Sequence, residues 1–171
     1  MADLGTLLDA DGRWTLRFER RFDHPPEKVW RCVVEPEHRD AWFPQRIVGD
    51  LVPGGALRFV DDPNLPGEGF AGRCVAIEPP HLLELDWGAD RLRVELSPDG
   101  DGTRFVLLDT VDDHPHAART GAGWQLCLDG LTAHLDGAAP SPVTATIWDD
   151  VHGRYLDLLG GERHGWGSTP S

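Results

Sequence analysis

Apolar and polar residues alternate along most of the first two thirds of the chain. Trp14, Leu16 and Phe18 are separated by polar residues, and the same alternation returns at Leu92, Val94 and Leu96. A period of two predicts strands with one buried face. Short turns separate these strands, so neighbouring strands should pair antiparallel. Strands are predicted over residues 14–22, 46–51, 56–60, 69–78, 83–87, 91–96 and 103–111.

The remaining apolar segments have a helical pattern. Prolines at the starts of 26–34 and 36–43 are typical of a first helical turn, which predicts two short helices after the first strand. From Trp124 onward, apolar residues recur at intervals of three and four, which predicts one long amphipathic helix to about Leu135. We therefore expect an α+β fold in which a curved antiparallel sheet of about six to seven strands wraps around this single long C-terminal helix.

The chain divides into one domain and an appendage. Residues 1–137 form the predicted domain, with its core over about 14–137, and residues 1–12 are expected to be loosely ordered. The stretch 112–123 is predicted to be a polar loop. Residues 138–159 follow as an appended helix, with Ile147, Val151, Tyr155 and Leu158 on its buried side. Residues 160–171 have the composition of a flexible tail.

Charge and composition exclude several classes of partner. The formal net charge is -13, which disfavours nucleic acids and anionic membrane surfaces. The chain begins without the pattern of a signal peptide, and no apolar run approaches the ~20 residues of a membrane span. Lys28 is the only lysine among many arginines, which suggests a GC-rich bacterial genome. We expect a cytoplasmic bacterial protein.

The sequence contains no recognisable catalytic, cofactor or metal motif. Cys32, Cys74 and Cys127 are far apart in apolar stretches, which predicts buried free thiols and neither a zinc site nor a cofactor. His114 and His116 read as exposed loop histidines, and His134 as a half-exposed residue at the edge of the long helix. No phosphate-binding glycine loop or nucleophilic serine motif is present.

Several segments together resemble the SRPBCC (START-like, helix-grip) superfamily, in its heat-shock protein 90 ATPase activator homologue-like (Aha-type) branch. They are the opening strand and helix Phe18 to Trp30, the segment Glu35 to Phe43 that ends in Trp-Phe, Val52-Pro53-Gly54-Gly55, Ile77 to Trp87 with its Pro79-Pro80, and Gly102 to Phe105 followed by Gly123 to Leu131. The resemblance covers about residues 14–137. It implies a helix-grip fold with an internal cavity, and relatives that bind lipids, sterols or hormones, or that cyclise polyketides.

These observations favour non-enzymatic binding of a small hydrophobic or aromatic ligand in a cavity between the sheet and the long helix. The alternative is that the same aromatic residues fill the core completely and leave no usable void. Asp109 should point inward with Leu107, as a polar anchor for the ligand, unless it meets water at the strand end. The candidate ligand-binding residues are Trp42, Phe59, Phe70, Trp87, Leu107, Asp109, Trp124, Leu128 and Leu131.

Two other functions remain open. A polyketide cyclase-like or aromatase-like enzyme would use Asp109, Arg73 and His134 as acid–base groups. A chaperone-associated interaction module is the second alternative. The sequence leaves the identity of the ligand open, and it is compatible with a monomer or a homodimer.

Overall fold

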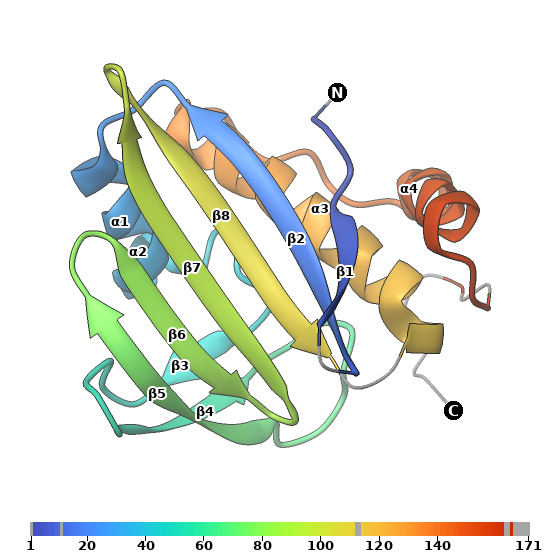
Figure 1. The fold of residues 1–171 in the computed structure, drawn as a ribbon, viewed down its shortest axis with the longest axis horizontal. Helices are drawn as coiled ribbons and strands as arrows, with labels where there is room; N and C mark the ends of the chain where they lie inside the picture. Colours follow the sequence, from blue (N-terminus) through green and yellow to red (C-terminus); the bar gives the residue numbers. More distant parts are fainter. Residues whose placement is uncertain (1, 11, 112–113, 163–164, 166–171) are drawn as a thin grey trace.

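The computed structural model describes residues 2–10, 12–111, 114–162 and 165. These residues form one eight-stranded antiparallel sheet in the order β1-β2-β8-β7-β6-β5-β4-β3, together with helices (Figure 1). The strands are β1 (Thr6–Ala10), β2 (Arg13–Phe22), β3 (Arg46–Val48), β4 (Ala56–Val60), β5 (Phe70–Glu78), β6 (Leu82–Trp87), β7 (Asp90–Asp99) and β8 (Gly102–Val111). The helices are α1 (Pro26–Val34), α2 (Pro36–Arg39), the 3-10 turn η1 (His114–His116), α3 (Ala117–Leu135) and α4 (Ala145–Leu159).

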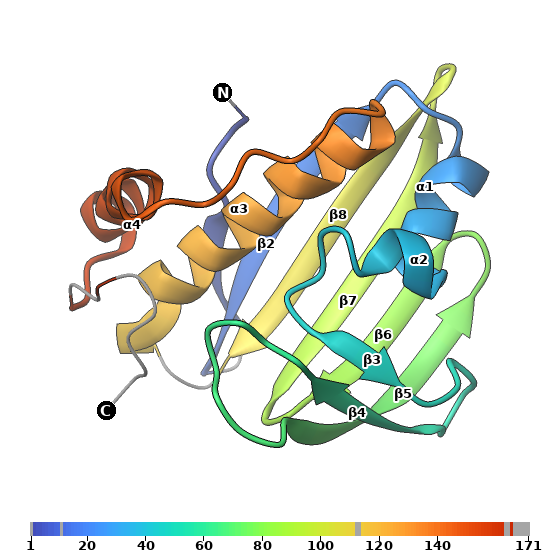
Figure 2. The same ribbon diagram turned by 180° about the vertical axis from the view of Figure 1, so that it is seen from behind.

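One face of the sheet carries the core. Figure 2 shows α3 running across β2 and β8, with α1 and α2 on the same face of the sheet. Apolar side chains of the strands meet the buried side of α3 there; they include Leu16, Phe18, Leu83, Leu85, Leu92, Phe105 and Leu107 from the sheet and Leu128, Leu131 and Leu135 from α3. This arrangement confirms the predicted helix-grip fold, with a slightly higher strand count.

The additional strand is β1, in a segment that we expected to be loosely ordered. It pairs antiparallel with β2, with Leu7 opposite Leu16. The next residue toward the N-terminus, Gly5, is also fixed, because its backbone N–H donates to the hydroxyl of Tyr155 at 2.7 Å. The signal for this strand is weak in the sequence because the segment is short and lies at the edge of the sheet.

Helix α3 begins earlier than the hydrophobic pattern indicated. The stretch 117–123, predicted as part of a polar loop, forms the first two turns of this helix. Gln125 lies outside the predicted apolar stripe of this helix, yet it is only 1 % exposed. Its side chain is covered by α4, from which the Tyr155 hydroxyl donates to Gln125 Oε1 at 2.8 Å.

Helix α4 lies against α3 and covers the second part of the predicted appended helix, whereas residues 138–144 form no regular element (Figure 1). The Thr144 side chain caps its first turn by accepting from the backbone N–H of Ile147. Val151 and Tyr155 are buried as predicted, but Ile147 is 37 % and Leu158 is 52 % exposed. Trp148 and His152 are buried in their place. Most of the predicted tail, 160–171, lies outside the described residues.

Candidate functional site

The space between the sheet and α3 is closely packed. A small void lies between Leu92 and Leu107 of the sheet and the segment of α1 and α2, and its volume of about 10 Å³ holds one water at most. Five of the predicted wall residues are fully buried in this packing: Phe59, Leu107, Asp109, Leu128 and Leu131. Large side chains therefore fill this part of the concave face of the sheet, and none of these five residues lines the open cleft of the protein.

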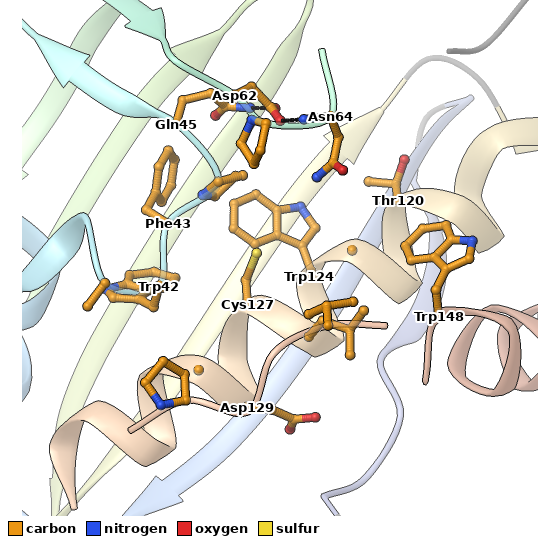
Figure 3. A pocket seen from close by; sticks show the side chains of 18 of the residues that line it. Trp42, Phe43, Gln45, Asp62, Asn64, Thr120, Trp124, Cys127, Asp129 and Trp148 are labelled. Carbon is orange, nitrogen blue, oxygen red and sulfur yellow. Dashed lines mark hydrogen bonds between the residues drawn. The ribbon is translucent and has the colours of Figure 1, made fainter. Parts of the chain in front are cut away.

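A cleft of about 1130 Å³ opens instead beside α3. Its walls are residues 41–45, the β4–β5 loop, the β6–β7 turn, one face of α3 and the linker that leads into α4 (Figure 3). The remaining predicted wall residues, Trp42, Phe70, Trp87 and Trp124, all line it. The linker runs back along α3, so the appended helix completes a wall that the predicted domain alone would lack (Figure 2).

Aromatic rings form the floor of the cleft. Trp124 and Trp87 have ring centroids 5.4 Å apart, and Phe43 lies 5.6 Å from Trp124. Phe70 meets Trp87 edge-on at 5.8 Å. Such tilted and edge-to-face contacts hold each ring in a defined orientation. The floor is therefore an apolar surface of rings held in defined orientations.

A network of polar side chains borders one end of this floor. Gln45 accepts a hydrogen bond from Trp87 Nε1 at 2.9 Å and donates to Asp62 Oδ2 at 2.6 Å. Asp62 also accepts from the backbone N–H of Asn64 at 2.8 Å, which fixes the β4–β5 loop (Figure 3). Both carboxylate oxygens of Asp62 are thus occupied by donors of the chain itself.

Arg119 supplies a positive charge to the same cleft. It lies in the first turn of α3, and its Nη1 is buried without a hydrogen-bond partner among the described residues. Burial lowers the pKa of Arg119, and the nearby charge of Asp62 opposes this change. A guanidinium nitrogen that has lost water needs an acceptor, so an anionic or carbonyl group of a ligand would stabilise it.

Cys32 and Cys74 are buried as the sequence indicated, whereas Cys127 is only partly buried. All three are free thiols, and burial raises the pKa of each. Cys127 lines the cleft, yet its pKa is raised to about 12. The thiol therefore stays protonated at neutral pH and makes a poor nucleophile.

Asp109 lies beneath the cleft floor. Its Oδ2 accepts a hydrogen bond from Trp124 Nε1 at 2.8 Å, and its Oδ1 is buried without a partner among the described residues. Burial and the charge of Asp90 raise its pKa to about 8, although the Trp124 hydrogen bond opposes the shift. Asp109 does point inward as predicted, but Trp124 covers it from the cleft.

The three candidate acid–base groups are not brought together. Arg73 forms an ion pair with Asp86 at 3.0 Å, and its side chain is 57 % exposed. His134 contacts His38 of α2. Neither residue lines the cleft, and neither does Asp109. Among the described residues, the clusters able to hold a metal ion also lie outside the cleft, around His38.

Several lining residues escaped the sequence analysis. Arg119 belongs to a stretch that was predicted as a loop, and Trp148 to an appended helix in which Ile147 was predicted on the buried side. Gln45 follows a proline and belongs to no regular element. The sequence patterns singled out none of these three residues.

The comparisons with known proteins concern the same fold. Residues 23–136 match the family described as Activator of Hsp90 ATPase homolog 1-like protein. CalU16 from Micromonospora echinospora is 26% identical over 86% of this chain and 89% of its own, with a TM-score of 0.70. The BPP1335 protein of Bordetella parapertussis is 28% identical over 92% and 91%, with a TM-score of 0.68. EF2215 of Enterococcus faecalis, a protein of unknown function, is 20% identical over 91% and 90%, with a TM-score of 0.73, and shares the fold alone.

None of the curated proteins matches this sequence. In the described part of the chain, every helix is too short or too polar to cross a membrane.

Proposed function

Because the chain belongs to the Activator of Hsp90 ATPase homolog 1-like family of the SRPBCC superfamily, we propose that its cleft binds a small aromatic ligand that carries an anionic or carbonyl group. The ligand's ring would lie on the aromatic floor, and its acceptor group would face Arg119. The protein would then hold or present the ligand without changing it.

The observation that carries this proposal is the position of Arg119 at the edge of an apolar cleft. Trp87, Trp124 and Phe43 offer ring faces and edges, which favour a flat partner. Asp62 already accepts hydrogen bonds from Gln45 and Asn64. Arg119 Nη1 has no such partner among the described residues. A binding site with many apolar contacts and few orienting polar groups is typical for small molecules.

The size of the cleft supports a ligand of several rings or a ring with a chain. Pockets for small molecules commonly have volumes of about 300–1000 Å³. The cleft, at about 1130 Å³, lies just above this range. A single benzene-sized molecule would leave most of the aromatic floor wet.

The two alternative functions have less support in the geometry. A cyclase-like enzyme would need acid–base groups in the cleft, and Asp109, Arg73 and His134 do not line it. A chaperone-associated module would need a docking surface, for which the family description gives no residue. The cytoplasmic location stays a prediction.

Native mass spectrometry of freshly purified protein is the test of the proposed function. We expect an additional discrete mass that disappears under denaturing conditions, or a shift upon adding polycyclic aromatic carboxylates. Competition with an environment-sensitive fluorophore gives the affinities. If no apolar compound of a broad library binds, and no mass co-purifies, the proposed function is wrong.

A further inference from the structure

A second cluster of chemically active side chains lies outside the cleft, where three helices meet. Cys32 of α1, His38 of α2 and His134 of α3 each offer one ligand atom, and these three atoms all lie within 4.8 Å of one another. His38 Nδ1 and His134 Nε2 face each other at 3.0 Å. Cys32 is 4 % exposed, and both histidines are half-buried.

This donor set fits one class of ion. A thiolate and two imidazoles are the ligands that Zn²⁺ prefers, at distances of about 2.0–2.3 Å. In a tetrahedral site with these distances, the ligand atoms lie about 3.3–3.6 Å apart. The histidine nitrogens are already slightly closer than this, and the sulfur lies within 4.8 Å of both. Hard cations such as Mg²⁺ and Ca²⁺ would be disfavoured, because they require oxygen ligands.

The surroundings of His38 provide the outer support that metal-binding histidines usually have. Glu35 Oε2 lies 3.7 Å from His38 Nε2, on the side of the ring away from His134. The other oxygen of Glu35 is held by Arg31 Nε at 3.1 Å. At 3.7 Å this contact is an ion pair and not a hydrogen bond; on metal binding a small approach would let Glu35 accept from Nε2–H, which leaves Nδ1 free to bind the metal.

From this geometry we propose that Cys32, His38 and His134 bind one zinc ion, with a fourth position left for water or an exogenous ligand. The ion would join α1, α2 and α3 at the C-terminal end of the long helix. The site adjoins the cleft wall, because Trp42 Nε1 donates to the backbone oxygen of Cys32 at 2.7 Å. Zinc would thereby fix the segment that carries Trp42 and Phe43. The site itself stands independently of the proposed ligand.

A direct hydrogen bond between the two imidazoles is the competing explanation of their contact. In that case one ring donates and the other accepts, and the Cys32 thiol only fills space. The two explanations differ in a measurable way, since only the first predicts a bond between a metal and the sulfur.

The test uses full-length, untagged protein that has been stripped of metal and kept reduced. Zinc is titrated against a chromophoric chelator, and Co²⁺ serves as the spectroscopic probe. We expect one zinc per chain, a thiolate-to-cobalt charge-transfer band, and d–d bands with the intensity of a four-coordinate site. Zinc should also raise the Tm, because it binds the folded state.

Variants then assign the ligands. Cys32→Ser and His134→Gln should each weaken zinc binding by more than about 100-fold, and Glu35→Gln by about tenfold, as for other outer-shell carboxylates. Cys127→Ser and His81→Gln are the matched controls; these residues lie outside the cluster, and both variants should bind zinc as the parent protein does. Circular dichroism confirms that each variant is folded.

Three outcomes would overturn the proposal. They are the absence of stoichiometric zinc binding, a cobalt complex without the thiolate band, and unchanged affinity in Cys32→Ser. The second outcome would point to the acidic group Glu35, Glu37 and His38, which contains no sulfur. Because the cobalt spectrum is recorded on the parent protein, a variant that fails to fold does not prevent a decision.

Discussion

Trp124 Nε1 donates a hydrogen bond to Asp109 Oδ2 at 2.8 Å, so the residue that lines the cleft also covers a buried carboxyl group. The contact joins α3 to β8. Asp109 is fully buried, with Leu16 and Leu92 as its cross-strand neighbours. Because desolvation raises its pKa to about 8, this carboxyl is protonated at neutral pH.

Asp109 should make the protein less stable as the pH rises. The folded-state pKa of about 8 lies above the unfolded value of about 3.9, so between these limits the folded state holds a proton that the unfolded state has lost. The stabilisation is therefore complete below pH 4 and is lost progressively up to about pH 8. Asp109→Asn keeps an acceptor for Trp124 and should raise stability at pH 8 by a few kcal/mol.

Urea unfolding across this pH range measures the effect. The difference in unfolding free energy between Asp109→Asn and the parent protein should grow with pH. Asp101→Asn is a suitable control, since the Asp101 side chain is 99 % exposed. A constant difference between pH 4 and pH 9 would show that Asp109 titrates at an ordinary pKa.

Two glycines of α3 should respond oppositely to alanine. A Cβ on Gly121 would lie 2.7 Å from the ring of Tyr155, whereas a Cβ on Gly123 meets nothing within 4 Å. Gly121→Ala should therefore cost about 1–2 kcal/mol, since overpacking against α4 outweighs the gain in helix propensity. Gly123→Ala should gain up to about 1 kcal/mol.

Thermal unfolding of the two variants, measured side by side, checks this prediction. Hydrogen exchange would show increased opening of α4 in Gly121→Ala alone. Equal stabilisation of both variants would mean that α4 does not pack on Gly121 in solution.

Tyr155 reports on the same contact between helices because it is the only tyrosine of the chain. Burial raises the pKa of its phenol to about 12, partly opposed by the hydrogen bond from Gly5. In the folded protein the phenolate band should appear near pH 12, and in urea near pH 10. The raised pKa also means that stability falls as the pH rises from about 10 to about 12.

An ultraviolet absorbance titration measures this ionisation, and Tyr155→Phe supplies the blank. That variant should also lose about 1–3 kcal/mol of stability, because Gly5 N–H and Gln125 Oε1 lose their shared partner. A phenolate that forms near pH 10 without denaturant would contradict the buried position of Tyr155.

The order of the elements could be predicted from sequence because the pattern is local. Alternation at Leu92, Val94 and Leu96 and the turn at 99–102 specify strands and their antiparallel pairing. The early start of α3 could not be predicted in this way. Its first turns contain Gly121 and Gly123, which lower helix propensity. Glycine is favoured at 121 because the ring of Tyr155, from a helix later in the sequence, occupies the space that a side chain would need.

The candidate sites depend even more on distant contacts. Side-chain packing decides whether large apolar residues enclose a cavity or fill it. Alternation alone therefore could not show that Phe59 and Leu107 fill the core while Phe70 and Trp87 line the cleft. The cleft also requires the linker after α3, whose path has no periodic signal. Likewise, Cys32, His38 and His134 come from three helices, and their spacing matches no metal-binding motif in the sequence.

Arg119 should discriminate between charged and neutral ligands of the same shape. Naphthalene-2-carboxylate and its neutral amide are a matched pair of probes, because both fit the aromatic floor. A hydrogen bond to a charged group contributes about 1.5–3 kcal/mol, so Arg119→Met should weaken the carboxylate at least about tenfold. The amide should lose less, since its carbonyl is the weaker acceptor.

Fluorescence titration of both probes against the parent protein and Arg119→Met provides the four affinities that this comparison requires. Arg104→Met is the control, because Arg104 pairs with Glu19 on the sheet and lies outside the cleft. It should leave both affinities unchanged, which separates a local contact from the effect of net charge. If Arg119→Met weakens the two probes equally, Arg119 shapes the cleft without selecting the anion, and the apolar floor alone determines binding.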